Sequence, residues 1–181
     1  GNPDIMYAQS QQGYLSRIDM TTGETVFVQP QPREGEPYER FNWDAPILVS
    51  PHKPSRLYFA SQRVWKSDDR GDSWTPISKD LTRNQERFDL PIMGSKQSWD
   101  NPWDVLAMSN YNTISALSES PVKEGLVYAG TDDGFINVTD NDGKNWKKYE
   151  VKKLPGAPEM AYVNDLKADN FDPNTVYAVL D

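Results

Sequence analysis

The sequence of 181 residues contains no cysteine and only one histidine, His52. Without cysteine the chain cannot form a disulfide bond or use a thiolate. A single histidine argues against a Ser-His-Asp triad or a histidine-rich metal site. No apolar stretch reaches the roughly 20 residues that a membrane-spanning helix needs. We therefore expect no metal, no cofactor and no membrane insertion.

Basic residues are also few: 19 Lys and Arg stand against 27 Asp and Glu, which gives a net charge of −8. Because phosphate repels such an acidic chain, we expect neither nucleic acid nor an anionic membrane surface as a partner. Aromatic residues are abundant, with six Trp and nine Tyr, and 14 Pro and 11 Gly interrupt the chain at many turns. This composition favours a loop-rich, all-β fold over a helical bundle.

Two stretches, residues 67–74 and 139–146, share the pattern Ser/Thr-x-Asp/Asn-x-Gly-x-x-Trp. In such a turn the polar side chains can hydrogen-bond backbone groups, and the glycine supplies a positive φ. The tryptophan begins the next strand and buries a large ring. We expect a structural role for the eight residues of the pattern: Ser67, Asp69, Gly71, Trp74, Thr139, Asn141, Gly143 and Trp146.

A short strand that contains an aromatic residue is predicted four times, at residues 5–8, 57–60, 126–129 and 175–178. An apolar run precedes each of the last three, and a tight turn and a further strand follow. That further strand leads into the turn pattern, and the tryptophan starts a fourth strand. Four short strands in a meander form one blade of a β-propeller. The predicted fold is therefore all-β, a partial β-propeller made of four-stranded antiparallel blades.

The repeat makes residues 1–181 part of one propeller. Blades are expected at about 45–79 and 112–151, partial blades at about 4–29 and 162–181, and a long insertion at 80–111. Because closed propellers have roughly 4–8 blades, we expect the sequence to be a fragment of a longer protein. Its open blade edges predict pairing with another copy or with further sequence.

The connections between the blades combine aromatic rings with carboxylates, a mixture that suits the binding of a sugar. Long loops without regular structure are uncommon in compact domains and are often functional. The run of residues 98–104 makes Asp100 and Asp104 the candidate catalytic acids. The candidate binding residues are Trp43, Arg87, Trp99, Trp103 and Tyr111. The alternative is that these rings pin long loops onto the propeller.

Further acids outside the two turns are Asp44, Glu119, Asp132 and Asp133. A glycoside hydrolase uses two carboxyl groups, roughly 5–5.5 Å apart for retention of configuration or 6.5–9.5 Å for inversion. On so acidic a chain, the presence of such a pair does not by itself identify an enzyme.

The turn pattern resembles the Asp-box, also called the BNR repeat. Residues 57–74, which join an aromatic strand to the first turn, are similar to large bacterial sortilin-like and BNR-repeat proteins classed as glycosyl hydrolases. The resemblance covers nearly the whole chain and implies a propeller in an extracytoplasmic protein, which is periplasmic, secreted or on the cell surface. Asn141 departs from the aspartate that the Asp-box prefers. Sialidases share the Asp-box, but no arginine triad of their kind is recognisable here.

Two functions stay open. In the first, the chain is a propeller segment that binds a glycan or a protein through the loops of one face. In the second, it is part of a glycoside hydrolase in which Asp100 or Asp104 is one member of an acid/base pair. An open cleft with paired acids and exposed rings would favour the enzyme, whereas buried rings and acids that cap turns would favour a scaffold.

Overall fold

The computed structural model describes residues 2–92, 94–100 and 109–181. Regular structure in these residues is β-sheet, apart from three short 3-10 turns: η1 (Gln11–Gly13), η2 (Arg87–Asp89) and η4 (Val151–Lys153). This described part of the chain contains no helix that is long and apolar enough to cross a membrane.

Four antiparallel sheets follow one another along the chain, and each is a meander of consecutive strands. The first sheet contains β1 (Ile5–Ser10), β2 (Tyr14–Asp19) and β3 (Thr25–Phe27). The second contains β4 (Ile47–Val49), β5 (Leu57–Ala60), β6 (Val64–Ser67) and β7 (Thr75–Pro76). The third contains β10 (Ile114–Glu119), β11 (Val127–Thr131), β12 (Phe135–Thr139) and β13 (Lys147–Glu150). The fourth contains β14 (Val163–Ala168) and β15 (Val176–Leu180), and a small hairpin of β8 (Pro91–Ile92) and β9 (Ser95–Lys96) stands apart.

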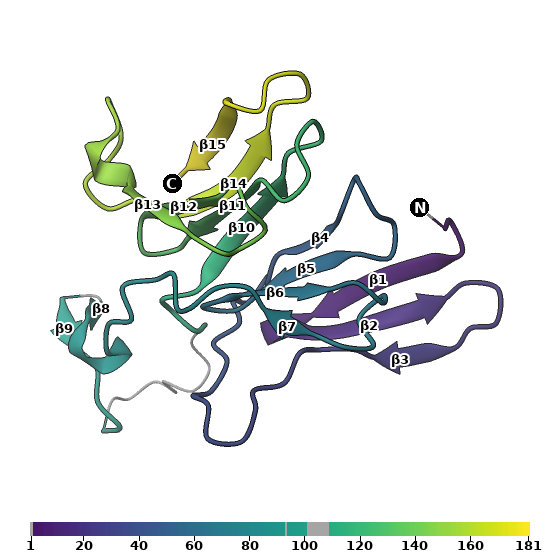
Figure 1. Cartoon of the computed structure of the whole chain (residues 1–181). Helices are drawn as coiled ribbons and strands as arrows, with labels where there is room; N and C mark the ends of the chain where they lie inside the picture. Colours follow the sequence, from purple (N-terminus) through teal and green to yellow (C-terminus); the bar gives the residue numbers. More distant parts are fainter. Residues whose placement is uncertain (1, 93, 101–108) are drawn as a thin grey trace.

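The sheets lie beside one another with their faces in contact, as consecutive propeller blades do (Figure 1). Strand β10 contacts β4 and β5 of the second sheet on one side and β14 of the fourth sheet on the other. The predicted fold, an all-β partial β-propeller made of four-stranded antiparallel blades, is confirmed.

Three apolar clusters fill the spaces between neighbouring sheets. Successive side chains of a strand point to opposite faces, so β5 contributes to two clusters. Its Phe59 stacks on Phe41 with ring centroids 5.2 Å apart, whereas its Tyr58 packs with apolar residues of β10 and β11. Between the third and fourth sheets, a β-carbon at Gly130 would overlap Val163, so this glycine lets the two sheets approach closely.

Side-chain hydrogen bonds close the turn at residues 67–74. The Gly71 amide donates to Ser67 Oγ at 2.8 Å, and the Ser73 amide donates to Asp69 Oδ1 at 2.9 Å. Gly71 has a φ of 91°, a value that glycine adopts without strain. Hydrogen bonds from Ser73 hold the pKa of Asp69 down to about 2, so the carboxylate accepts these bonds in its charged form.

The turn at residues 139–146 repeats this pattern. The Gly143 amide donates to Thr139 Oγ1 at 2.9 Å, and the Asn145 amide donates to Asn141 Oδ1 at 3.0 Å. Asn141 thus makes the bond that Asp69 makes in the first turn. The second turn lacks the charge of Asp69 and has no counterpart of the bond that the Ser73 hydroxyl donates to Asp69 Oδ2 at 2.6 Å.

Each turn also fastens its sheet to the preceding one through its tryptophan. Trp74 Nε1 donates to the Val28 carbonyl at 2.7 Å, and Trp146 Nε1 donates to the Ile77 carbonyl at 2.9 Å. Val28 directly follows β3 and Ile77 directly follows β7, so both carbonyls lie at the end of the outer strand of the neighbouring sheet. The indole N–H groups therefore repeat one contact between successive blades.

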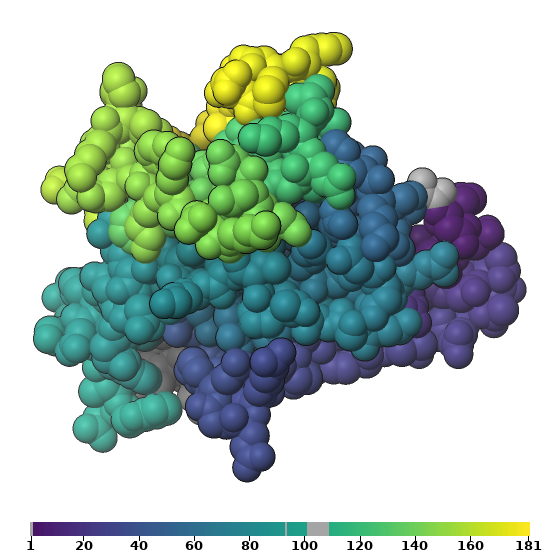
Figure 2. Space-filling model, viewed as in Figure 1, coloured from purple at the N-terminus to yellow at the C-terminus, as the bar shows by residue number. Residues whose placement is uncertain are grey.

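The meander topology determines which loops lie at the same end of the sheets. Since the strands alternate in direction, the connections between sheets emerge at the same end as the hairpins at residues 61–63 and 132–134. We call this the loop end, and it also carries residues 30–46 and 109–113. The turns at residues 67–74 and 139–146, which we call the box turns, lie at the opposite end of the sheets. Figure 2 shows segments near residue 35 (blue) and residue 90 (teal) projecting at the lower edge of the molecule.

Candidate functional site

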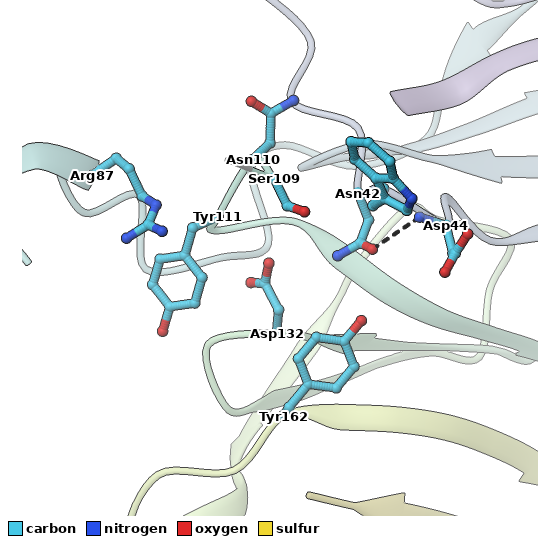
Figure 3. A pocket seen from close by; sticks show the side chains of 9 residues that line it. Asn42, Asp44, Arg87, Ser109, Asn110, Tyr111, Asp132 and Tyr162 are labelled. Atoms are coloured by element: carbon cyan, nitrogen blue, oxygen red, sulfur yellow. Dashed lines mark hydrogen bonds between the residues drawn. The ribbon is translucent and has the colours of Figure 1, made fainter. Parts of the chain in front are cut away.

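A cleft of about 680 Å³ opens at the loop end. Its walls come from the connection before β4, from η2, from the segment before β10, from the turn between β11 and β12, and from the segment before β14 (Figure 3). The lining residues are Asn42, Trp43, Asp44, Arg87, Ser109, Asn110, Tyr111, Asp132 and Tyr162. Residues far apart in the sequence thus meet in one site because consecutive sheets present their loops at the same end.

Asp132 is the most deeply buried acid of this cleft, with 7% of its surface exposed. Its carboxyl group accepts bonds from the Thr113 amide at 2.9 Å and the Thr113 hydroxyl at 2.7 Å. Asn42 in turn donates to that hydroxyl oxygen at 2.8 Å. Burial raises the pKa of Asp132 to about 7, although the bonds from Thr113 oppose this shift. A carboxyl group of this kind is divided between its acid and its base form near neutral pH.

Two half-buried tyrosines, Tyr111 and Tyr162, also line the cleft. Burial, followed by the nearby Asp132 carboxylate, raises the pKa of both phenols, so both stay protonated at neutral pH and can donate hydrogen bonds. The guanidinium of Arg87 lies 5.6 Å from the centre of the Tyr111 ring, within cation–π range.

Trp43 and Asp44 lie on the wall contributed by the connection before β4. The indole of Trp43 keeps 36% of its surface exposed, and Asp44 is exposed beside it. The backbone here is held in place, because the Asp44 amide donates to Asn42 Oδ1 at 3.2 Å and the Gln12 amide donates to the Trp43 carbonyl at 3.1 Å. The ring and the carboxylate are thus presented from a fixed main chain.

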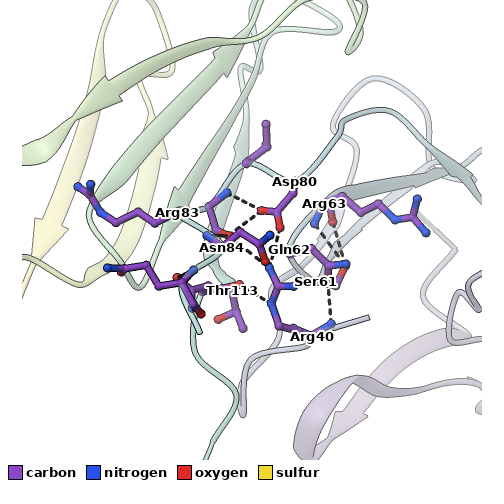
Figure 4. Close-up of polar contacts among 12 residues, drawn as sticks. Arg40, Ser61, Gln62, Arg63, Asp80, Arg83, Asn84 and Thr113 are labelled. Atoms are coloured by element: carbon purple, nitrogen blue, oxygen red, sulfur yellow. Dashed lines mark hydrogen bonds and ion pairs between the residues drawn. The ribbon is translucent and has the colours of Figure 1, made fainter. Parts of the chain in front are cut away.

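Polar contacts at the loop end pin this connection to the second sheet (Figure 4). Arg40 binds Asp80 at 2.7 Å and donates from Nε to the Asn112 carbonyl at 3.2 Å. Glu39, which is 3% exposed, pairs with Arg63 at 2.5 Å. The loop that carries Trp43 is therefore anchored at Glu39 and Arg40.

The other two acids from the sequence have structural partners. Asp133 accepts a bond from the Arg83 amide at 2.7 Å, and burial raises its pKa. Glu119 is buried and accepts bonds from the Tyr58 hydroxyl at 3.2 Å and the Gly125 amide at 3.1 Å. The described residues hold no group of three or more His, Cys, Asp or Glu side chains that could bind a metal ion.

The structure brings together three of the predicted binding residues: Trp43, Arg87 and Tyr111 line the same cleft. Trp99, with 69% of its surface exposed, packs on Phe88 at 5.1 Å between ring centroids and does not line the cleft. Asp100 is exposed and is also not among the lining residues. Trp103 and Asp104 lie outside the described residues.

Sequence reasoning did not select Asn42 or Tyr162, and it treated Asp132 as one acid among many. Tyr162 directly precedes β14, where it pairs with Asp181 through the backbone at 2.9 Å. The first strand of each of the last three sheets begins at the loop end. The position of Tyr162, directly before such a strand, was therefore the signal in the sequence that could have indicated a place at this end.

The cleft combines three aromatic rings with hydroxyl, amide, carboxyl and guanidinium groups. Aromatic rings offer flat apolar surfaces to the faces of pyranose rings, and the polar groups can bond sugar hydroxyls. An open cleft lined by aromatic rings and several polar groups suits a ligand that lies along it. Such a surface can hold an oligosaccharide chain.

No protein-family model matches the sequence, and no curated protein sequence matches it. Solved structures do resemble the fold. An ancestral GH74 (glycoside hydrolase) enzyme superimposes with a TM-score of 0.58 at 12% sequence identity, over 98% of this chain and 21% of that one. The GH74 enzyme of Niastella koreensis gives a TM-score of 0.56 at 11% identity, over 99% of this chain and 25% of that one. The chain thus spans a fifth to a quarter of these enzymes, and the likeness shows a shared β-propeller fold.

Proposed function

We propose that this chain is a propeller segment that binds a glycan in the cleft at its loop end. The observation that carries the proposal is the convergence of Trp43, Tyr111 and Tyr162 with Asp44 and Asp132 around one open cleft. The rings would stack on sugar faces, and the carboxyl and phenol groups would bond the hydroxyls. The fold shared with enzymes named as glycoside hydrolases supports a carbohydrate ligand over a protein ligand.

The two box turns support kinship with Asp-box proteins, because both make the same bonds and the same tryptophan contact. We therefore propose that the chain belongs to an extracytoplasmic bacterial protein, where polysaccharides are accessible. The turns themselves lie away from the cleft and hold the blades together. We therefore assign them no part in ligand binding.

Affinity electrophoresis through gels that contain plant, bacterial or host polysaccharides tests this function. At least one polysaccharide should retard the wild-type chain, and Trp43→Ala should weaken that binding about tenfold, since a truncated aromatic anchor costs roughly 1–2 kcal/mol. Trp99→Ala is the matched control, because it removes an exposed indole that does not line the cleft. Equal loss in both variants, or no retardation by any polysaccharide, would reject the proposed site.

A second candidate function is glycoside hydrolysis, and the pKa of about 7 at Asp132 favours it. A general acid works best with a pKa near the working pH, and Asp44 lies in the same cleft as a possible base. Sugar release should then vanish in Asp132→Asn and in Asp44→Asn. The original candidates give the competing outcome: loss in Asp100→Asn or Asp104→Asn, with Asp132→Asn active, would place the acid in the insertion.

We also propose that the exposed edges of the sheets pair with further strands. Among the described strands β15 pairs only with β14, so one of its edges is unpaired, and its side chains Tyr177 and Val179 are 59% and 53% exposed. An unpaired strand edge favours β-pairing. Light scattering across a concentration series checks for pairing between copies. A mass that stays monomeric throughout would remove a second copy as the partner.

A further inference from the structure

Among the described residues Arg87 has no anionic partner, unlike four of the eight arginines of this protein. Four others are paired with carboxylates: Arg17 with Asp72, Arg40 with Asp80, Arg56 with Asp68, and Arg63 with Glu36, at 2.7–2.8 Å. Arg87 makes no ion pair or side-chain hydrogen bond within the described part of the chain, and its Nε is buried without a partner. A buried donor left without an acceptor costs free energy, so the protein itself compensates the Arg87 guanidinium poorly.

The position of Arg87 makes this unpaired group part of the cleft. The side chain rises from η2, is half-buried, and lies over the Tyr111 ring at 5.6 Å. Figure 3 shows Arg87 on one side of the cleft and Asp44 on the opposite side, with Tyr111, Asp132 and Tyr162 between them. The cleft thus has a cationic end and an anionic end, separated by aromatic rings.

Building on the proposed glycan binding, we infer that Arg87 forms a subsite for the carboxylate of an acidic sugar, a uronate. The planar guanidinium presents parallel N–H donors that match the two oxygens of a carboxylate. The opposite end, with Asp44 and Trp43, accepts neutral sugars through hydroxyl bonds and stacking. The net charge of −8 disfavours dense polyanions, so the fitting ligand carries isolated uronates among neutral sugars.

The inference is tested with pairs of polysaccharides that differ only in charge. Glucuronoxylan and xanthan, which carry uronates among neutral sugars, are each compared with their own carboxyl-reduced derivative, in which the uronate has become a neutral sugar. The wild-type chain should bind at least one native polymer roughly tenfold more tightly than its reduced form, as expected for one charge-assisted contact. Arg87→Gln should abolish this difference, and Arg87→Lys, which keeps the charge without the planar fork, should retain part of it.

Arg33→Gln is the matched control, because it makes the same change of charge at an exposed arginine away from the cleft. It should preserve the preference for the native polymer, and thermal unfolding of each variant confirms that the fold is intact. Equal binding of native and reduced polymers, or a preference that survives Arg87→Gln, would overturn the inference while leaving glycan binding in place. Failure to bind any native or reduced polymer would overturn both.

Discussion

Asp132 both packs between neighbouring segments, through its hydrogen bonds with Thr113, and lines the cleft. Its side chain lies between a buried contact with Thr113 and the open site, and burial raises its pKa to about 7. The sequence placed this acid in a tight turn next to Asp133 but could not distinguish it from the other carboxylates. Its burial depends on Thr113 and on Asn42, which reach it from other parts of the chain.

This raised pKa makes a prediction about stability. Between about pH 4 and pH 7 the folded chain keeps a proton on Asp132 that the unfolded chain has lost, since the ordinary pKa is 3.8. Stability from this group is therefore greatest below pH 4 and declines as the pH rises to about 7. Urea unfolding of the wild type and of Asp132→Asn, from pH 4.5 to 7.5, measures this decline. The wild type should lose stability relative to the variant, by an amount on the order of 3 kcal/mol.

Acids with lowered pKa values act in the opposite direction, and they cancel in that comparison. Hydrogen bonds to neighbouring amides lower the pKa of Asp169 and Asp172, so their contributions are lost as the pH falls. Both residues are present in both proteins. If the stability curves of the wild type and Asp132→Asn run parallel over this range, Asp132 ionises normally and the account of its burial is wrong.

Among the elements, the turns at residues 67–74 and 139–146 show most directly why the fold needs particular residues of the sequence. Gly143 has a φ of 85°, and a β-carbon there would lie 2.5 Å from the Ile77 carbonyl oxygen. The glycine therefore serves both the turn and the contact with the preceding sheet. The same two demands meet at Gly71, whose β-carbon would lie 3.0 Å from the Val28 side chain.

Two glycine substitutions separate the cost of a positive φ from the cost of overlap with the preceding sheet. Gly23→Ala places a β-carbon at a φ of 75° in open space, so it should cost only the backbone strain, about 1 kcal/mol. Gly143→Ala adds the overlap with Ile77 and should destabilise by roughly 2–4 kcal/mol. Denaturant unfolding of both variants checks the difference. Equal costs would show that the turn at residues 139–146 does not pack tightly on the second sheet.

The repeated strands were predictable because their signals are local. The aromatic strands expected at residues 57–60 and 126–129 correspond to β5 and β11 within two residues at either end. The hairpin of β8 and β9 was not predicted, since strands of two residues are too short to carry a periodic pattern. Strand β7 has only two residues and is defined by its pairing with β6 and not by its own sequence.

For the molecule as a whole, the function we propose depends on which loops meet. The sequence identified Trp43, Arg87 and Tyr111 from the composition of the connections, but their convergence follows from the order of the sheets. Tyr162 completes the cleft from the start of the partial blade expected at about 162–181, where the sequence indicated no binding residue. Long-range contacts such as Arg40 with Asp80 set these loops in place, and no local pattern predicts such pairs.

The most direct test of the central claim, that the loop end binds a glycan, follows the indole N–H signals of the tryptophans by NMR. On addition of oligosaccharides from a retarding polysaccharide, the signal of Trp43 should shift. The signals of Trp74 and Trp146, which donate to backbone carbonyls in the box turns, should stay unchanged. A shift confined to Trp99, or shifts at the box-turn tryptophans with none at Trp43, would contradict this account.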